Sequence, residues 1–285
     1  MTETLFYNTF DRFPTFSGPF PFIIPLDQTS LVGDHMVVNL IQKGDYVGAL
    51  YLDIGTNQLE DLEYFEILIS KTLCWRFNGE IIHILRELRT PSQKKKLFDN
   101  IVQIPINPFP AIEEVQIRLK VNSQNVQESN MRIIADFIYT GKNTDGKFFI
   151  EQIQQVNTPN DLRFRHCVKE LIVVAQDTSQ SGFNFSNTVA HIDLYLNNEL
   201  KCSDSALFFS TVQHMRRHTS LCPNVFVIPF ALNPEEPSPS GTVNMSMIQR
   251  QRIVLTPSQQ NVRIYALSYN VLSVENNLGS LQFIL

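Results

Sequence analysis

The chain has 285 residues, a formal net charge of −5 at pH 7, and 43% hydrophobic residues. This composition excludes a chain that is disordered throughout, and the acidic balance argues against a strongly basic protein that coats nucleic acid. The length suffices for one large all-β domain or two small ones. Phenylalanine is frequent, with 21 residues against one tryptophan, which suits the cores of packed sheets and subunit interfaces.

The first residues, Met1–Thr4, have no basic region followed by an apolar one, so we expect no secretory signal. No apolar run is long enough to cross a bilayer, and we expect a soluble product made in a reducing compartment. The cysteines form no CxxC pair and lack the spacing of metal ligands, which predicts free, buried thiols. They are Cys74, Cys167, Cys202 and Cys222.

The chain opens with an aromatic segment that is rich in proline. Its prolines exclude a regular helix, and its phenylalanines would be an aggregation hazard if they were exposed. We therefore expect an amino-terminal arm, residues 1–17, that docks on the domain or on a neighbour. The residues of this aromatic stretch are Phe10, Phe13, Pro14, Phe16, Pro19, Phe20, Pro21 and Phe22.

Most of the remaining chain alternates between apolar and polar residues, the period of a half-buried strand. In 115–121, for example, Val115, Ile117 and Leu119 share one face. Two short segments, 62–73 and 205–217, instead carry apolar residues near a 3.6 period and predict helices. Strands are predicted at 35–41, 46–54, 101–105, 115–121, 131–139, 147–156, 167–176, 192–196, 224–231, 242–247, 250–255, 262–271 and 280–285.

A polar, turn-rich stretch at 157–163 is the best internal boundary. It divides the chain into two β-rich parts, 18–157 and 163–285. A single sandwich needs about seven to nine strands, and the chain offers about a dozen candidates. Two sandwiches in tandem fit this number better than one.

Candidate chemistry is sparse. His214 and His218 are four residues apart, so on a helix they would share a face and could bind a metal ion. No third ligand is evident, and Arg216 and Arg217 would repel a cation, so a turn or helix-end position is the better interpretation. No motif for a nucleophile or a phosphate loop is present, and we predict no catalytic residue, no metal and no cofactor.

The sequence also contains two charge runs. Glu235 and Glu236 lie between prolines, in a predicted loop, with no partner nearby in the sequence. Lys94–Lys96 is the only dense basic patch and could contact nucleic acid or an acidic partner. A solvated loop is the more common outcome for such a run. We therefore predict no specific nucleic-acid partner.

The run from Val225 to Met247, VFVIPFALNPEEPSPSGTVNMSM, resembles the major capsid proteins of nucleocytoplasmic large DNA viruses. In that family a strand ends in a similar "FALNPEE" run, followed by "PSG" and an Asn-x-Ser strand. Other matches follow in family order along nearly the whole chain. They include Val37–Ile54, Phe149–Val156, Val168–Gln176 (VKELIVVAQ), Val212–Thr219 (VQHMRRHT) and Ala266–Leu281.

The resemblance implies an all-β fold of two tandem eight-stranded antiparallel jelly rolls, a double jelly roll, with short helical excursions. It further implies a homotrimer with a pseudo-hexagonal outline that tiles an icosahedral shell in the virion, assembled in the host cytoplasm. Its partners would be neighbouring capsomers, with room for minor capsid proteins and an internal membrane. The chain is shorter than typical members, notably around 106–111 and 140–147, which implies low surface loops.

The resemblance leaves alternatives open: a minor or penton capsid protein, a scaffolding protein of the same fold, or a carbohydrate-binding jelly-roll module. For a capsid subunit, the residues expected to serve assembly lie in the arm and in the proline-rich loop. They are Phe10, Phe13, Phe16, Pro234, Pro237 and Pro239.

Overall fold

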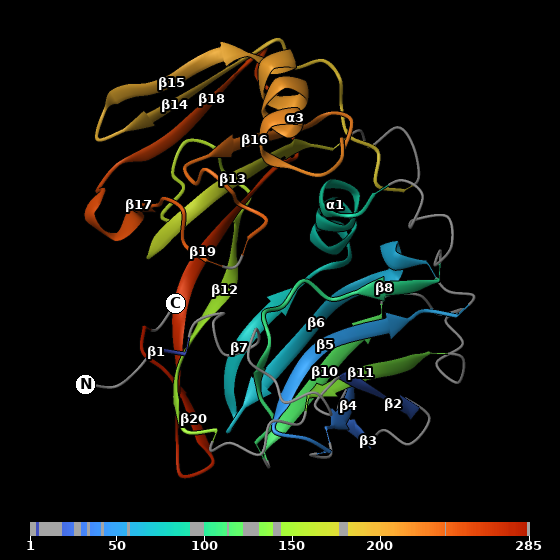
Figure 1. The fold of residues 1–285 in the computed structure, drawn as a ribbon. Helices are drawn as coiled ribbons and strands as arrows, with labels where there is room; N and C mark the ends of the chain where they lie inside the picture. The colour runs from blue at the N-terminus through green and yellow to red at the C-terminus, as the bar shows by residue number, and fades with distance from the viewer. Residues whose placement is uncertain are drawn as a thin grey trace. The chain divides into compact units, whose positions relative to one another are not determined.

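A computed structural model gives the fold of the chain (Figure 1). It describes residues 4–5, 19–25, 30–32, 35–40, 43–55, 58–91, 100–112, 114–121, 131–138, 144–176, 182–236 and 238–283. The chain forms two compact units. Unit 1 comprises Met1–Arg86, Gln93–Gln152 and Asn270–Ile284, and unit 2 comprises Glu87–Ser92 and Ile153–Tyr269, with Leu285.

Unit 1 contains two five-stranded sheets. The first has the strand order β3-β4-β10-β6-β7, and the second has β2-β11-β5-β8 with β9 beside β5. Trp75 and Phe109 lie in the core of this unit with their ring centroids 5.1 Å apart. The strands are β2 (Pro19–Pro25), β3 (Ser30–Val32), β4 (His35–Asn39), β5 (Tyr46–Asp53), β6 (Leu62–Ile69), β7 (Thr72–Phe77), β8 (Ile101–Gln103), β9 (Phe109–Pro110), β10 (Val115–Val121) and β11 (Arg132–Ile138).

Unit 2 contains the three-stranded sheet β15-β14-β18 and much of a seven-stranded sheet. The larger sheet has the order β1-β12-β19-β13-β16, with β17 paired to β13 and β20 to β19. Its strands β12 and β19 each begin in one unit and end in the other. The strands of these two sheets are β1 (Thr4–Leu5), β12 (Gly146–Val156), β13 (Cys167–Ala175), β14 (His191–Leu196), β15 (Glu199–Ser205), β16 (Val225–Pro229), β17 (Val243–Asn244), β18 (Gln251–Thr256), β19 (Val262–Glu275) and β20 (Leu278–Leu281).

One apolar cluster holds unit 2 together. It joins buried side chains from both sheets, as expected when each sheet turns one apolar face inward. Val173 of β13, Ile192 of β14 and Ile264 of β19 are all fully buried in it. Phe209 adds an aromatic ring from the helical segment that contacts β16.

The predicted strands are largely confirmed. The segments expected at 46–54, 115–121, 131–139 and 167–176 are β5, β10, β11 and β13, and 262–271 is the first part of the longer β19. The segment 242–247 is a strand only at Val243–Asn244, and Met245–Met247 forms the 3-10 helix η6. The domain limits 18–157 and 163–285 stay a prediction, and the structure groups Asn270–Ile284 with unit 1.

The helix predicted at 62–73 is wrong, because this segment forms β6 and the start of β7. Tyr64, Phe65 and Ile67 are aromatic and β-branched residues that favour a strand lying between two partners, and β6 pairs with both β10 and β7. The hairpin turn consists of Ser70 and Lys71, both with positive φ (49° and 65°). Such turns usually contain Asn or Gly, so Ser70 and Lys71 carry no recognisable turn signal.

Two helical segments are present among the described residues besides short 3-10 turns. The one predicted at 205–217 is confirmed: a π-helical turn, η5 (Phe208–Val212), leads into α3 (Gln213–Arg217). Helix α1 (Gly79–Arg89) was not predicted, although Asn78 caps it by accepting a hydrogen bond from the Ile81 N–H at 2.9 Å. The other short helix is η3 (Leu59–Asp61). Within the described residues, no helix is long and apolar enough to span a membrane.

Candidate functional site: a buried ionic cluster beneath the proline-rich loop

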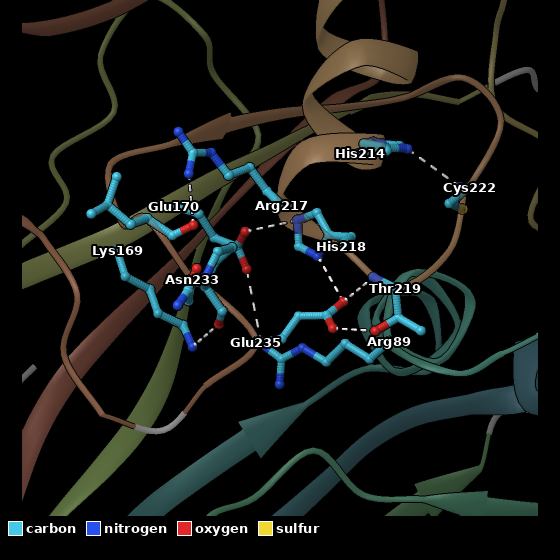
Figure 2. A network of polar contacts seen from close by, with 12 residues as sticks. Arg89, Lys169, Glu170, His214, Arg217, His218, Thr219, Cys222, Asn233 and Glu235 are labelled. Carbon is cyan, nitrogen blue, oxygen red and sulfur yellow. Dashed lines mark hydrogen bonds and ion pairs between the residues drawn. The ribbon is translucent and has the colours of Figure 1, made fainter.

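Four separate segments of unit 2 bring charged side chains together at one place (Figure 2). They are the end of α1, the start of β13, the end of α3, and the loop that follows β16. We call Arg89, Lys169, Glu170, His218 and Glu235 the ionic cluster. Lys169 and Glu170 are fully buried, which is rare for charged residues unless they are paired.

Strand β13 supplies two adjacent members of the cluster. In a regular strand, Lys169 and Glu170 would point to opposite faces of the sheet. The pairing of β13 with β19 is irregular between Val168 and Glu170, so Lys169 has no partner residue in β19. Such a bulge redirects side chains locally. It accounts for the presence of both Lys169 and Glu170 in the cluster (Figure 2).

His218 lies at the centre, between two carboxylates. Its Nε2 is 3.2 Å from Glu170 Oε2, and its Nδ1 is 3.2 Å from Glu235 Oε1. Burial alone would lower the pKa of His218, but the carboxylates of Glu170 and then Glu235 outweigh it and raise the pKa to about 9. The ring is therefore an imidazolium at neutral pH, with Nδ1 hydrogen-bonded to Glu235 and Nε2 in an ion pair with Glu170.

Glu170 stays ionised despite complete burial. Burial by itself would raise the pKa of this carboxyl, but His218, Lys169 and Arg89 lower it below its ordinary value. Arg89 Nη2 lies 3.9 Å from Glu170 Oε1, so Arg89 is a more distant ion-pair partner of Glu170 than His218 is. Each carboxylate oxygen of Glu170 thus faces one cation.

Glu235 is the member that the loop contributes. Its Oε1 accepts a hydrogen bond from the Thr219 N–H at 2.8 Å, and its Oε2 accepts one from the Thr219 hydroxyl. Burial opposes ionisation, but His218 and these Thr219 hydrogen bonds lower the pKa of Glu235. The loop and the end of α3 are therefore joined by one carboxylate with three donors.

Lys169 fixes the path of the loop that follows β16. Its ammonium group donates to the Pro234 carbonyl and lies 5.6 Å from the centroid of the Tyr269 ring. Its own main-chain carbonyl accepts hydrogen bonds from the N–H groups of Phe230 and Ala231, at 2.8 and 2.9 Å. One residue of β13 thus holds both the start and the middle of the loop.

Further contacts complete the attachment of the loop. Arg217 Nη1 donates to the Leu232 carbonyl at 2.7 Å, and the Asn233 N–H donates to Ser240 Oγ at 2.8 Å. Gly241 ends the loop with φ +142°, and a Cβ atom there would lie 2.7 Å from the Phe230 carbonyl oxygen. The return of the chain at this position therefore requires glycine.

The arrangement suits structural fixation better than catalysis. His218 cannot act as a general base, because a general base needs a free lone pair and both ring nitrogens of His218 carry protons at neutral pH. The Thr219 hydroxyl donates to Glu235, but the lowered pKa of this carboxylate makes it too weak a base to activate a hydroxyl as a nucleophile. The cluster instead holds four chain segments in one geometry.

The histidine pair considered for metal binding has a different role. The His214 and His218 rings lie 6.0 Å apart and nearly perpendicular. Burial first, and then the positive His218, lower the pKa of His214 to about 4, so its ring is neutral and its Nδ1 accepts from the Cys222 N–H at 3.4 Å. Across the described ranges, no group of three His, Cys, Asp or Glu residues could hold a metal ion.

The structure locates only part of the predicted assembly set. Phe10, Phe13, Phe16 and Pro237 lie outside the described residues, as does the basic run Lys94–Lys96. Pro239 is exposed, whereas Pro234 is buried. Pro234 could therefore influence assembly only through the shape of the loop.

Sequence reasoning missed the cluster, although the segments that carry Glu170, His218 and Glu235 had been noted separately. The detectable signal was Lys169–Glu170 inside a strand whose other residues are apolar on both faces, because buried charges require partners. The partners lie 48 or more positions away along the chain, as the distance from Glu170 to His218 illustrates. Only the fold brings them together.

Comparisons with known proteins identify the family of the chain. The family model described as "Large eukaryotic DNA virus major capsid protein" matches residues 111–280, more than half of the chain. The chain is 28% identical over 169 residues to a major capsid protein of Pyramimonas orientalis virus, covering 48% of this chain and 43% of that protein. It is 35% identical over 107 residues to one of Phaeocystis pouchetii virus, covering 34% and 21%. The alignments thus span less than half the length of these relatives.

Solved structures show the same fold. PBCV-1 VP54, fitted into a cryo-EM reconstruction of the virophage Sputnik, matches with a TM-score of 0.73 and 16% identity, covering 96% of this chain and 99% of that chain. The major capsid protein P2 of bacteriophage PM2 matches with a TM-score of 0.59 and 10% identity, covering 91% and 100%. The predicted all-β, double jelly-roll fold is thereby confirmed, and the number of eight strands per roll stays a prediction.

Proposed function

The chain belongs to the large eukaryotic DNA virus major capsid protein family, and from this premise we propose that it is a shell-forming subunit of a virion. In the proposal, three copies form a trimer with a pseudo-hexagonal outline, because each copy contributes two similar jelly rolls. Such trimers then tile an icosahedral shell. The match of the family model to residues 111–280 is the observation that carries this proposal.

The ionic cluster supports a structural role for the loop above it. Charged groups with fixed partners hold the loop from Phe230 to Gly241 in one conformation, and a subunit that is repeated many times in a shell needs its surface loops preformed. Exposed Leu232 and Pro239 lie on this loop. We propose that the loop presents such residues to neighbouring copies, together with the arm residues Phe10, Phe13 and Phe16.

The family and fold imply a structural role, and the proposal requires no catalysis and no cofactor. Neighbouring capsomers are the main proposed partners, followed by minor capsid proteins and an internal membrane. The proposed location is the virion, with assembly in the host cytoplasm. An obligate contact within the trimer would bury on the order of thousands of Å² of largely apolar surface.

Mass determination of the purified oligomer tests the proposal directly. Native mass spectrometry of the expressed chain should give three times the chain mass of 32.7 kDa. A pentamer would indicate a vertex protein, and a stable monomer at micromolar concentration would contradict self-assembly. Electron microscopy of the same sample should show particles with a pseudo-hexagonal outline.

Quantitative proteomics of purified virions provides an independent test. A major shell protein should be the most abundant chain in the particle. Absence from mature virions would identify a scaffolding role instead and would refute the proposal.

A further inference from the structure

Unit 2 contains an open cleft of about 570 Å³ between the β14–β15 hairpin and the segment around β16. Strands β15 and β16 are the outermost strands of their sheets along the described strand orders, so the cleft lies along two sheet edges. Its volume is typical of pockets that receive apolar groups. The lining residues are Leu194, Leu196, Asn197, Glu199, Lys201, Cys202, Ile228, Pro229, Phe230, Val243 and Ile248.

The floor of the cleft continues the apolar core. Cys202, Phe230, Val243 and Ile248 are only partly buried, although they pack against the core cluster. Met247, next to Ile248, is 76% exposed. An apolar floor that is partly open to water marks a contact surface.

The rim of the cleft is polar. Asn197, Glu199 and Lys201 are exposed at its edge, and Lys201 forms an ion pair with Glu199. An apolar centre within a polar rim is the anatomy of a protein–protein contact. The occupant should therefore be a peptide segment with bulky apolar side chains and charges of both signs.

The chain itself contains a segment of this chemistry. Residues 6–18 carry Phe6, Phe10, Phe13 and Phe16, with the charged pair Asp11–Arg12 between them. Asp11 and Arg12 can pair with Lys201 and Glu199 at the rim. The segment's phenylalanines need cover, and the cleft needs an apolar occupant.

We propose that residues 6–18 of a second copy of the chain insert phenylalanine side chains into this cleft. The strands that flank the segment pair inside unit 1: β1 with β12 at Lys147–Phe148, and β2 with β11. The cleft belongs to unit 2. A segment held at both ends can extend by about half of its contour length, on the order of 20 Å, which is enough to reach an adjacent molecule.

The inference rests on the proposed function, because exchange of this segment would link copies in a shell. It explains why so aromatic a segment is tolerated: each copy covers the phenylalanines of another. It also defines the contact as heterologous, since the donated segment and the receiving cleft are different surfaces.

A site-directed crosslink tests the contact. The cleft already contains Cys202, while Cys74 and Cys222 are buried, so the Cys167→Ala background leaves Cys202 as the accessible thiol. Phe13→Cys in this background, oxidised mildly, should form a disulfide with Cys202 between two chains. Non-reducing electrophoresis should show covalent dimers and larger species, and peptide mass spectrometry should identify the linkage. The Cys202→Ser variant should abolish them.

Outcomes other than this interchain linkage would overturn the inference. A linkage found only within one chain would assign the segment to its own cleft. No linkage in a sample that is trimeric by mass would overturn the inference while the proposed function stands. Absence of both linkage and oligomer would count against both.

Thiol labelling provides a readout that needs no new cysteine. Burial, Asp204 and Asp193 raise the pKa of Cys202, so maleimide labelling is done at mildly alkaline pH. In the Cys167→Ala oligomer, labelling of Cys202 should be at least ten-fold slower than in the same chain with Phe10, Phe13 and Phe16 changed to serine. Circular dichroism should confirm that both proteins are folded. Equal labelling rates in the two proteins would overturn the inference.

Discussion

Replacing Glu170 with glutamine removes the central negative charge of the ionic cluster while keeping the size of the side chain. The side chain is 0% exposed, so water cannot take over its role. The His218 imidazolium would then retain only Glu235, and Arg89 would lose its buried counter-charge. Removing one partner of a buried ion pair costs about 3–5 kcal/mol. We expect about 3 kcal/mol, the lower end, because Arg89 is 21% exposed and partly hydrated.

Urea unfolding followed by circular dichroism measures this loss as a change in the free energy of unfolding. Hydrogen exchange should report it locally, as faster exchange of the amides of Phe230, Ala231 and Asn233. The matched control is Asp161→Asn, which breaks an ion pair with Arg163 that is closer, at 2.6 Å, but exposed. The control should leave the unfolding curve unchanged.

The double variant Glu170→Gln/His218→Gln separates the loss of a contact from the burial of an uncompensated charge. If the buried imidazolium causes the instability, the double variant should be more stable than Glu170→Gln alone. A Glu170→Gln protein as stable as the Asp161→Asn control would refute the reasoning, because the cluster would then contribute nothing to the folded state.

Four further predictions concern pH and backbone conformation. The pKa of His218 is raised to about 9 from 6.5, so its stabilising contribution is complete below about pH 6.5 and is lost as the pH rises through 9. Tm measured from pH 5 to 10 should therefore fall on the alkaline side, and it should fall less steeply in the His218→Gln variant. The lowered pKa values of Glu170 and Glu235 act in the opposite direction: their contribution is present above 4.5, the ordinary value, and acid titration below it should lower Tm. Gly241→Ala should destabilise the protein by about 1–3 kcal/mol, because its Cβ would lie 2.7 Å from the Phe230 carbonyl oxygen at φ +142°, and an unchanged Tm would contradict this. Lys71→Gly should raise the free energy of unfolding by up to about 1 kcal/mol, since glycine adopts the observed φ of 65° without strain, and a lower value would show that the Lys71 side chain stabilises the hairpin.

The fold was predictable wherever one face of a strand is buried and the other is not. Strand β10, with Val115, Ile117 and Leu119 buried on one side, was predicted with its correct limits because alternation is a local property. Strand β15 was not predicted: its residues Glu199–Ser205 are mostly exposed and polar, and only pairing with β14 defines it. An edge strand with little burial carries almost no periodic signal.

The helix predicted at 62–73 shows the limit of periodicity in short segments. Apolar residues at 62, 65, 68 and 69 fit a helix, but they also fit a strand that is buried on most of its surface. What decided the outcome was pairing on both sides, with β10 and β7, together with a hairpin turn of two non-glycine residues at positive φ. Neither property is visible in a window of the sequence.

The candidate site was predictable in its parts and not in its connections. The resemblance had singled out the segments with Glu170, His218 and Glu235 as separate motifs. It did not show that their side chains are in contact. The structure shows this contact, because His218 forms ion pairs with both Glu170 and Glu235. Sequence reasoning left Glu235 without a partner because His218 lies 17 positions away and at the end of a different element.

The loop from Phe230 to Gly241 needs this cluster because it has little apolar anchoring of its own. Ala231 and Pro234 are buried, but Leu232 is 62% exposed and Asn233, Glu236 and Pro239 face solvent. Hydrophobic burial therefore cannot fix its shape, whereas ion pairs and hydrogen bonds to defined atoms can, since they are directional. The same loop begins with Phe230, which lines the cleft proposed to receive the segment of a second copy. Glu170→Gln should therefore slow disulfide formation between Phe13→Cys and Cys202, although Glu170 does not contact the donated segment in the proposal. An unchanged rate would show that the ionic cluster does not influence the cleft.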